Sequence, residues 1–212
     1  VEIVDSLGTL LYGLTVDSEG RVYIAQTDAR NEVNGRAGTR GDGLEEMENR
    51  AFLNQVTRVD CSGQACAEPQ RIELEPLPPA HPAPGLALAT PFAIEISADD
   101  ATLVMTAAGS NMLFTVDAAS GELLGRTAVG AAPRGIALES DDAGRPARAW
   151  VFNAVDNTVT ALDLSDPGSP LVTGTVVLAD PTHPAVKRGR MAFNDASASS
   201  TGTFSCESCH PD

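Results

Sequence analysis

The chain has 212 residues, enough for one domain or a domain with an appendage; 42% of them are hydrophobic, with 29 acidic against 14 basic side chains. This apolar content excludes a disordered tail, and no apolar run approaches the roughly 20 residues of a membrane-spanning helix. The net charge of −15 excludes nucleic acid as a partner and favours a basic protein, unless it serves solubility alone.

Three stretches of the chain share one plan, in which two short β-type runs flank a turn rich in Asp, Gly and Ser. They are YGLTVDSEGRVYIAQ from Tyr12, FAIEISADDATLVMTAA from Phe92 and RGIALESDDAGRPARAWVFNA from Arg134. Each continues into a third run that alternates apolar and polar positions, and then into a fourth. The fourth runs start at Arg71, Leu123 and Leu171. The sequence therefore predicts three units of four strands each.

The spacing of these units favours a β-propeller. Equivalent positions of the second and third units, Ala93 and Gly135, lie 42 residues apart, which is typical of a four-stranded propeller blade. A β-sandwich is the alternative, because it also joins short strands by turns. Sandwich strands do not repeat a four-strand sequence plan, so we expect a propeller.

The third unit resembles the YVTN-type β-propeller repeat, in which a Gly-Ile-Ala strand precedes a Tyr-Val-like strand, an Asn and a Thr-Val-x-x-Asp strand. Those places are held by Val151, Asn153, Thr158, Val159 and Asp163. The resemblance is looser in the other units and spans about Leu11 to Ala179. It implies an all-β fold over residues 1–180, a partial propeller of about three four-stranded blades.

Three blades do not close a ring, because propellers typically have four to eight of them. The opening VEIVDSLG is predicted to be a spare strand, the last of a preceding blade. We expect the remaining blades upstream of Val1 or on another chain.

Two insertions interrupt the blades, at residues 27–52 and 75–91. The first is rich in Gly, Asn and carboxylates, and a short helix is predicted over Leu44 to Phe52. Its carboxylates offer the oxygen ligands that calcium prefers, but their spacing departs from the EF-hand loop, and a solvated acidic face is the alternative. The candidate ligands are Asp42, Glu45, Glu46 and Glu48. The second insertion is proline-rich and is expected to be an extended connector.

Cys61 and Cys66 flank the turn after the third strand of the first unit, in CSGQAC. Two cysteines that face each other across a hairpin turn can meet disulfide geometry, and a disulfide implies an oxidising compartment. The alternative is a reduced pair or half of a metal site. We expect the disulfide.

Residues 181–212 depart from the blade pattern: a helix is predicted over Ala185 to Phe193, followed by a Ser- and Gly-rich loop and the motif CESCH. Cys-x-x-Cys-His is the attachment motif of c-type haem. Two thiols at this spacing reach the two vinyl groups of one porphyrin, and the next histidine ligates the iron. Cys206 and Cys209 are therefore predicted as the thioether anchors and His210 as the axial ligand. A zinc half-site and a thioredoxin-like redox pair are the alternatives.

The approach to this motif, RGRMAFNDASASSTGTFSCESCH, resembles the first haem segment of the bacterial di-haem cytochrome c peroxidase family. The matching residues are Gly189, Arg190, Phe193, Asp195, Ser205, Cys206, Cys209 and His210. The resemblance covers about 25 residues and implies that they begin a cytochrome c domain. From their place on the preceding helix, we expect Phe193 and Met191 to cover one edge of the haem, with Met191 packing rather than ligating the iron. It also implies a periplasmic or cell-surface location in a bacterium, which agrees with the expected disulfide.

Two functions follow from these expectations. In the first, the propeller is joined to a peroxidase-type cytochrome that transfers electrons or reduces peroxide, with a basic redox protein as partner. In the second, the propeller is a binding or assembly module of a larger cell-surface protein, and the haem segment is only an electron relay. The resemblance suggests a peroxidase-like oxidoreductase, but the peroxidatic pocket would lie outside these residues.

Overall fold

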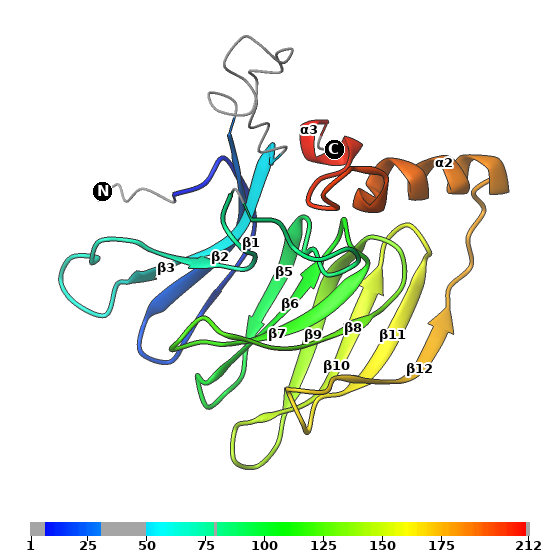
Figure 1. Ribbon diagram of the computed structural model, residues 1–212. Coiled ribbons are helices and arrows are strands. Elements are labelled where there is room, and N and C mark those ends of the chain that lie inside the picture. Colours follow the sequence, from blue (N-terminus) through cyan, green and yellow to red (C-terminus); the bar gives the residue numbers. More distant parts are fainter. Residues whose placement is uncertain (1–6, 31–49, 79, 211–212) are drawn as a thin grey trace, which may run out of the picture.

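The computed structural model describes residues 7–30, 50–78 and 80–210, and the strands among them form three four-stranded antiparallel sheets in chain order (Figure 1). The first sheet contains β1 (Leu10–Val16), β2 (Arg21–Ala29), β3 (Phe52–Asp60) and β4 (Gln70–Glu73). The second contains β5 (Pro91–Ile96), β6 (Thr102–Ala107), β7 (Met112–Asp117) and β8 (Leu123–Ala128). The third contains β9 (Pro133–Ser140), β10 (Pro146–Asn153), β11 (Thr158–Asp163) and β12 (Leu171–Val177). The predicted three units of four strands are confirmed.

The sheets pack face to face as propeller blades do, with β5 lying against both β1 and β9. Side chains alternate between the faces of a strand, so β6 is buried on both sides. Leu103 and Met105 belong to the core that the second sheet shares with the first, whereas Val104 packs with Ala149 and Val151 of the third. Each pair of neighbouring sheets is therefore held together by its own apolar core.

The outer face of the third sheet is exposed, whereas the equivalent face of the second sheet is buried against the third. Trp150 and Phe152 occupy in β10 the register positions that Val104 and Thr106 occupy in β6. Val104 and Thr106 are 0% exposed, whereas Trp150 is 37% and Phe152 is 40% exposed. We call this exposed apolar surface, centred on Trp150 and Phe152, the open face.

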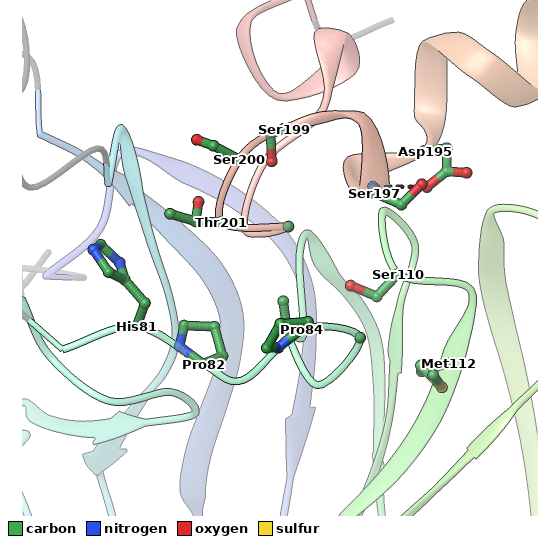
Figure 2. Close-up of a pocket in the computed structure, with 13 residues that line it drawn as sticks. His81, Pro82, Pro84, Ser110, Met112, Asp195, Ser197, Ser199, Ser200 and Thr201 are labelled. Carbon is green, nitrogen blue, oxygen red and sulfur yellow. Dashed lines mark hydrogen bonds between the residues drawn. The ribbon is translucent and has the colours of Figure 1, made fainter.

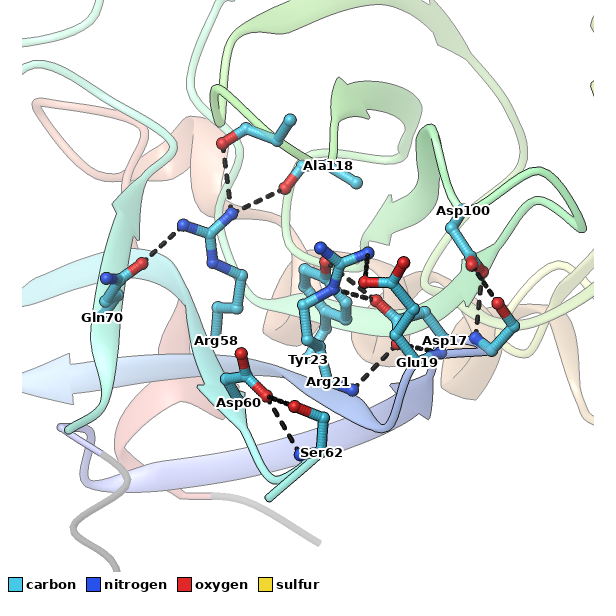
Figure 3. Close-up of polar contacts among 12 residues, drawn as sticks. Asp17, Glu19, Arg21, Tyr23, Arg58, Asp60, Ser62, Gln70, Asp100 and Ala118 are labelled. Atoms are coloured by element: carbon cyan, nitrogen blue, oxygen red, sulfur yellow. Dashed lines mark hydrogen bonds and ion pairs between the residues drawn. The ribbon is translucent and has the colours of Figure 1, made fainter. Parts of the chain in front are cut away.

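The turn that joins the first two strands is built alike in the first and third sheets. In the first, the Asp17 carboxylate accepts the Arg21 backbone N–H and pairs with the Arg21 guanidinium (Figure 3). In the third, Asp141 accepts from the Arg145 backbone and guanidinium in the same way. The glycine before each arginine has a positive φ, 87° and 83°, which explains the shared Asp-x-x-Gly-Arg pattern.

Two further contacts stabilise the same end of the molecule. The Arg58 guanidinium donates to the carbonyls of Ala118 and Ala119, at 3.0 and 3.1 Å, and so ties the first sheet to the second (Figure 3). Cys61 and Cys66 form the predicted disulfide across the turn that follows β3.

The first insertion is shorter than predicted, because both flanking strands extend into it. β2 runs to Ala29 and β3 begins at Phe52, and these two residues are paired. The helix predicted over Leu44 to Phe52 is wrong at its end, since Phe52 opens β3, whose first six residues are buried in the sheet. Arg50 and Ala51, also within that prediction, are not helical. Residues 44–49 of the predicted helix, the candidate calcium ligands Asp42, Glu45, Glu46 and Glu48, and most of the spare strand (1–6) lie outside the described residues.

The second insertion folds back onto the first sheet, through buried polar contacts that its proline content did not predict. Glu75 is 7% exposed and accepts from the Leu88 N–H at 2.7 Å, which joins the two ends of the insertion. Arg50 pairs with the same carboxylate at 3.0 Å and donates to the Pro76 carbonyl, also at 3.0 Å. Burial raises the pKa of Glu75 and lowers that of Arg50.

β12 ends on the side of the sheet away from the Asp-x-x-Gly-Arg turns, and beyond it the chain forms α2 (Pro184–Asn194), the 3₁₀ turn η1 (Ala196–Ala198) and α3 (Cys206–Cys209) on that side (Figure 1). The predicted helix is confirmed with one more residue at each end. His183 caps its start by accepting from the Ala185 N–H, and Pro184 suits the first turn. Of the helices in the described ranges, none is long and apolar enough to cross a membrane.

Candidate functional site: a Cys-x-x-Cys-His turn on the propeller

The predicted haem-binding residues lie on one short turn. α3 is a single helical turn in which the Ser205 N–H donates to the Ser208 hydroxyl at 3.0 Å and the His210 N–H to the Cys206 carbonyl at 3.1 Å. Cys206 and Cys209 are both exposed and free, and His210 is exposed as well. Residues three apart in a helix share one side, so the two thiols lie on the same side of the turn.

These groups border a hollow of about 400 Å³. Phe204 and Ala198 provide apolar lining, and Asp195, Ser199 and Ser205 complete the wall. The donor set fits covalent haem, because two free thiols and an adjacent imidazole are the groups that its attachment requires. Phe193 was expected to cover one edge of this site; it lines a different hollow, beneath α2, together with Val186 and Arg190.

The opposite side of the turn is fixed to the propeller by an ion pair. Glu207, which lies between the two cysteines, has a side chain only 4% exposed, and its carboxylate accepts from the Arg134 guanidinium at 3.0 Å. The same guanidinium nitrogen donates to the side-chain amide oxygen of Asn194, also at 3.0 Å. Arg134 of β9 therefore contacts both the end of α2 and the middle of the Cys-x-x-Cys sequence.

Arg134 is itself packed against residues of the other two blades. Its guanidinium carbon lies 5.2 Å from the centre of the Phe92 ring in β5, within the range of a cation–π contact. The Phe92 ring in turn stacks on Tyr12 of β1, with 5.2 Å between the ring centres. Burial raises the pKa of Tyr12, and the nearby Glu207 carboxylate adds to this effect. A continuous ladder of side chains thus runs from the first blade to Glu207.

Three contacts hold the loop that precedes the turn. The Asn54 amide donates to the Thr203 carbonyl at 3.0 Å, and the Phe52 and Phe204 rings lie 6.2 Å apart. Nearer α2, the Ala196 N–H donates to the Gly109 carbonyl at 2.8 Å. These contacts come from the first two blades, and with Arg134 of the third, all three blades hold the C-terminal segment.

A second hollow, of about 370 Å³, lies between the proline-rich insertion and the loop after α2 (Figure 2). His81 and Pro84 line one side, and hydroxyl side chains of the loop line the other. The Ser110 hydroxyl accepts from the Ala89 N–H at 2.9 Å, and Ser199 donates to the Ala196 carbonyl at 2.9 Å. Ser110 thus holds the end of the insertion and Ser199 the loop after α2. His81 lies at this hollow rather than beside His210.

In the described part of the chain, no group of three or more His, Cys, Asp or Glu side chains gathers as a metal site would require. The predicted trio Cys206, Cys209 and His210 is brought to one surface. Sequence reasoning missed Arg134 and Glu207. A signal was present at Arg134, where a cation stands at the repeat position that Tyr12 and Phe92 hold in the other units.

No protein-family model matches the chain, and a search of curated proteins also finds no match. Among solved structures, it is similar to hydrazine synthase of Kuenenia stuttgartiensis, with 14% identity over 75% of this chain and 46% of that one, and a TM-score of 0.56. It is also similar to the periplasmic gluconolactonase of Pseudomonas aeruginosa, with 14% identity over 85% of this chain and 46% of that one, and a TM-score of 0.53. These likenesses show a β-propeller-like fold, and the chain spans less than half of either structure's length.

Proposed function

We propose that the chain carries a covalently attached c-type haem on the α3 turn and acts in electron transfer or peroxide reduction. Cys206 and Cys209 would hold the group through thioether bonds, and His210 would be its axial ligand. When bound, haem supplies an iron centre that cycles between two oxidation states. The observation that carries the proposal is the orientation of the turn: Glu207 is buried against the propeller, whereas both thiols and His210 are exposed beside an apolar-lined hollow.

The propeller's part in this function is to hold the attachment turn and to present it to a partner. Arg134 and Asn54 fix the turn and its preceding loop from the blade side. The net charge of −15 would steer a basic redox protein towards the molecule, and such steering acts mainly on the association rate. We assign no part in this function to the hollow near His81, because its lining stabilises the loop after α2.

We also propose a periplasmic or cell-surface location. The Cys61–Cys66 disulfide supports it, because disulfides persist in oxidising compartments. The periplasmic gluconolactonase of Pseudomonas aeruginosa, which is similar in fold, supports it further.

A second function, as an assembly module with the haem as a relay only, is favoured by the open face. Trp150 and Phe152 are exposed where the equivalent residues of the second blade are buried by the third. We propose that a further propeller blade covers the open face, and that it belongs to the same longer polypeptide or to a neighbouring chain.

Expression with export and haem c maturation in a bacterial host tests the haem proposal. We expect the purified, denatured chain to give a pyridine haemochrome spectrum and to keep its haem on a denaturing gel. The double variant C206A/C209A should lose both signals. C61S/C66S removes the same number of sulfurs and should keep both.

Folded wild-type chain that carries no covalent haem would refute the proposal. Once haem is bound, peroxide consumption with a reduced basic cytochrome as donor separates the two functions. Turnover supports peroxide reduction, whereas electron exchange with the donor that peroxide does not accelerate supports the relay.

A further inference from the structure

Tyr12, Phe92 and Arg134 hold one equivalent position in the three blades. Each lies near the start of its blade's first strand, where the pairing with the second strand is irregular. The register shifts between Leu11 and Leu14 in β1 and between Pro91 and Ile94 in β5, and again around Arg134 in β9. Such bulges re-aim a side chain out of the regular alternation of the sheet.

The three re-aimed side chains meet because the first strands approach closely. A Cβ atom added at Gly13 would lie only 2.6 Å from the Phe92 carbonyl oxygen, so β1 and β5 come as near as a glycine allows. The Tyr12 and Phe92 rings stack, and the Arg134 guanidinium rests on Phe92. The equivalent positions of the three blades thus form a row of packed side chains, two aromatic and one cationic, and the cation contacts Glu207.

We infer that Arg134 is the positioning residue of the α3 turn: the Phe92–Tyr12 stack holds its guanidinium, and the guanidinium holds Glu207, which orients Cys206 and Cys209 outward. This role rests on the proposed function, since the turn is the proposed site of haem attachment. It assigns the orientation of the turn to the propeller rather than to the short helix, in which a single turn has little stability of its own.

The geometry of the pair supports this role. The Arg134 side chain is 21% exposed and that of Glu207 is 4% exposed, so their attraction is screened less than at the surface. One guanidinium also reaches Asn194 at the end of α2, so a single residue fixes both helices relative to each other. Removal of the cation would leave a buried carboxylate without this partner, which favours release of the turn from the blade.

Hydrogen–deuterium exchange on the haem-free chain tests the inference. In R134M, which keeps the apolar stem, we expect the amides of 203–210 to exchange roughly tenfold to a hundredfold faster, the range for loss of a charged hydrogen bond. The amides of β6 and β7 should be unchanged, which shows that the variant is folded. R134K should recover part of the protection of these amides, because lysine restores the positive charge but not the planar guanidinium with its several donors.

R58M is the matched control, because Arg58 also joins two blades, through Ala118 and Ala119 at the opposite end of the molecule. It should leave exchange at 203–210 at the wild-type level. In the double variant R134M/E207M no carboxylate is left without its cation, so exchange should be no faster than in R134M. Wild-type exchange at 203–210 in R134M, or faster exchange in β6 and β7 to the same degree, would overturn the inference.

A haem readout separates the two proposals. In haem-loaded protein, R134M should shift the midpoint potential relative to wild type, whereas R58M should not. Chain that shows the exchange pattern but takes up no haem would refute the proposed function and leave the role of Arg134 intact. Chain that takes up haem but shows no exchange effect would refute the role of Arg134 alone.

Discussion

Asn54 shows at the residue scale how one side chain connects three parts of the chain. Its amide nitrogen donates to the Glu75 carboxylate at 3.1 Å and to the Thr203 carbonyl at 3.0 Å, and its oxygen accepts from the Thr90 N–H at 3.1 Å. It lies in the middle of a polar network that also contains Arg50. The sequence did not reveal this network, because its members come from segments up to 149 residues apart.

The Arg50–Glu75 pair gives a prediction about stability and pH. Both side chains are almost fully buried, so R50M should lower the free energy of unfolding by about 3–5 kcal/mol through the unpaired carboxylate it leaves. Burial already raises the pKa of Glu75. A carboxyl group with a raised pKa destabilises the folded state only when it is ionised. The destabilisation caused by R50M should therefore shrink as the pH falls through the pKa of Glu75 in the folded state.

Urea unfolding at about pH 7 and about pH 5 measures this effect, because the loss at the lower pH should be the smaller of the two. R50M/E75L removes both charges and should be less destabilised than R50M at the higher pH. An R50M loss that is equal at both values would contradict the assignment of the cost to the carboxylate.

The disulfide gives a second prediction at this scale. C61S/C66S should lower the free energy of unfolding by about 2 kcal/mol, the value that closing so short a loop predicts. Thermal unfolding without reductant measures it, and wild type with reductant should approach the variant. This bond was predictable from sequence because the two cysteines flank one hairpin turn, so local chain geometry alone brings them together.

At the scale of the elements, strand pattern carried most of the fold. Alternating runs bounded by Asp and Gly turns predicted all three sheets, and the helix predicted over Ala185 to Phe193 is present as Pro184–Asn194. The helix predicted up to Phe52 was wrong at its C-terminal end because β3, which begins at Phe52, pairs along its whole length with β2, and tertiary pairing outweighed local propensity there. The fit of α3 to the blades required contacts that no local pattern encodes.

The start of α2 gives a prediction about a single carboxylate. The Thr182 N–H and hydroxyl, with a smaller effect from Lys187, lower the pKa of Asp180 to about 2. Lys187 lies 3.0 Å from this carboxylate and also donates to the Asp156 carbonyl. Since the folded pKa is depressed, its contribution to stability is complete above about pH 4 and is lost as the pH falls through about 2.

An NMR titration of the Asp180 carboxyl should therefore show a midpoint near 2. K187M should raise this midpoint only part of the way to its usual value, because Thr182 has the larger effect. T182A removes the hydroxyl but keeps the Thr182 N–H, which has the largest effect, so it should also raise the midpoint only part of the way. A midpoint at the usual value in K187M would show that the ion pair with Lys187 dominates.

At the scale of the whole molecule, the blades form an arc with chemically unequal surfaces. The strand ends near Arg134 carry the C-terminal segment, and the opposite ends carry the Asp-x-x-Gly-Arg turns and the disulfide. The third blade ends the described arc in the open face. The repeat predicted that more blades are needed, and the register comparison between β10 and β6 shows which residues such a blade would cover.

The open face gives the last prediction, and Trp150 makes it measurable because it is the only tryptophan of the chain. Its side chain is partly exposed, so emission from the dilute chain should be red-shifted and readily quenched by acrylamide. Apolar faces of this kind tend to associate. As the concentration rises, copies of the chain should cover each other's open face, and the emission should shift to the blue.

F152T introduces the residue type that Thr106 provides at the equivalent position of the second blade, and it should weaken this association by about tenfold, a change of about 1.4 kcal/mol. Leu77→Thr, at an exposed site in the second insertion, should leave it unchanged. Sedimentation velocity supplies the association constants. Emission that stays red-shifted at every concentration, with equal sedimentation of wild type and F152T, would show that the face is stable in water and needs no further blade to cover it.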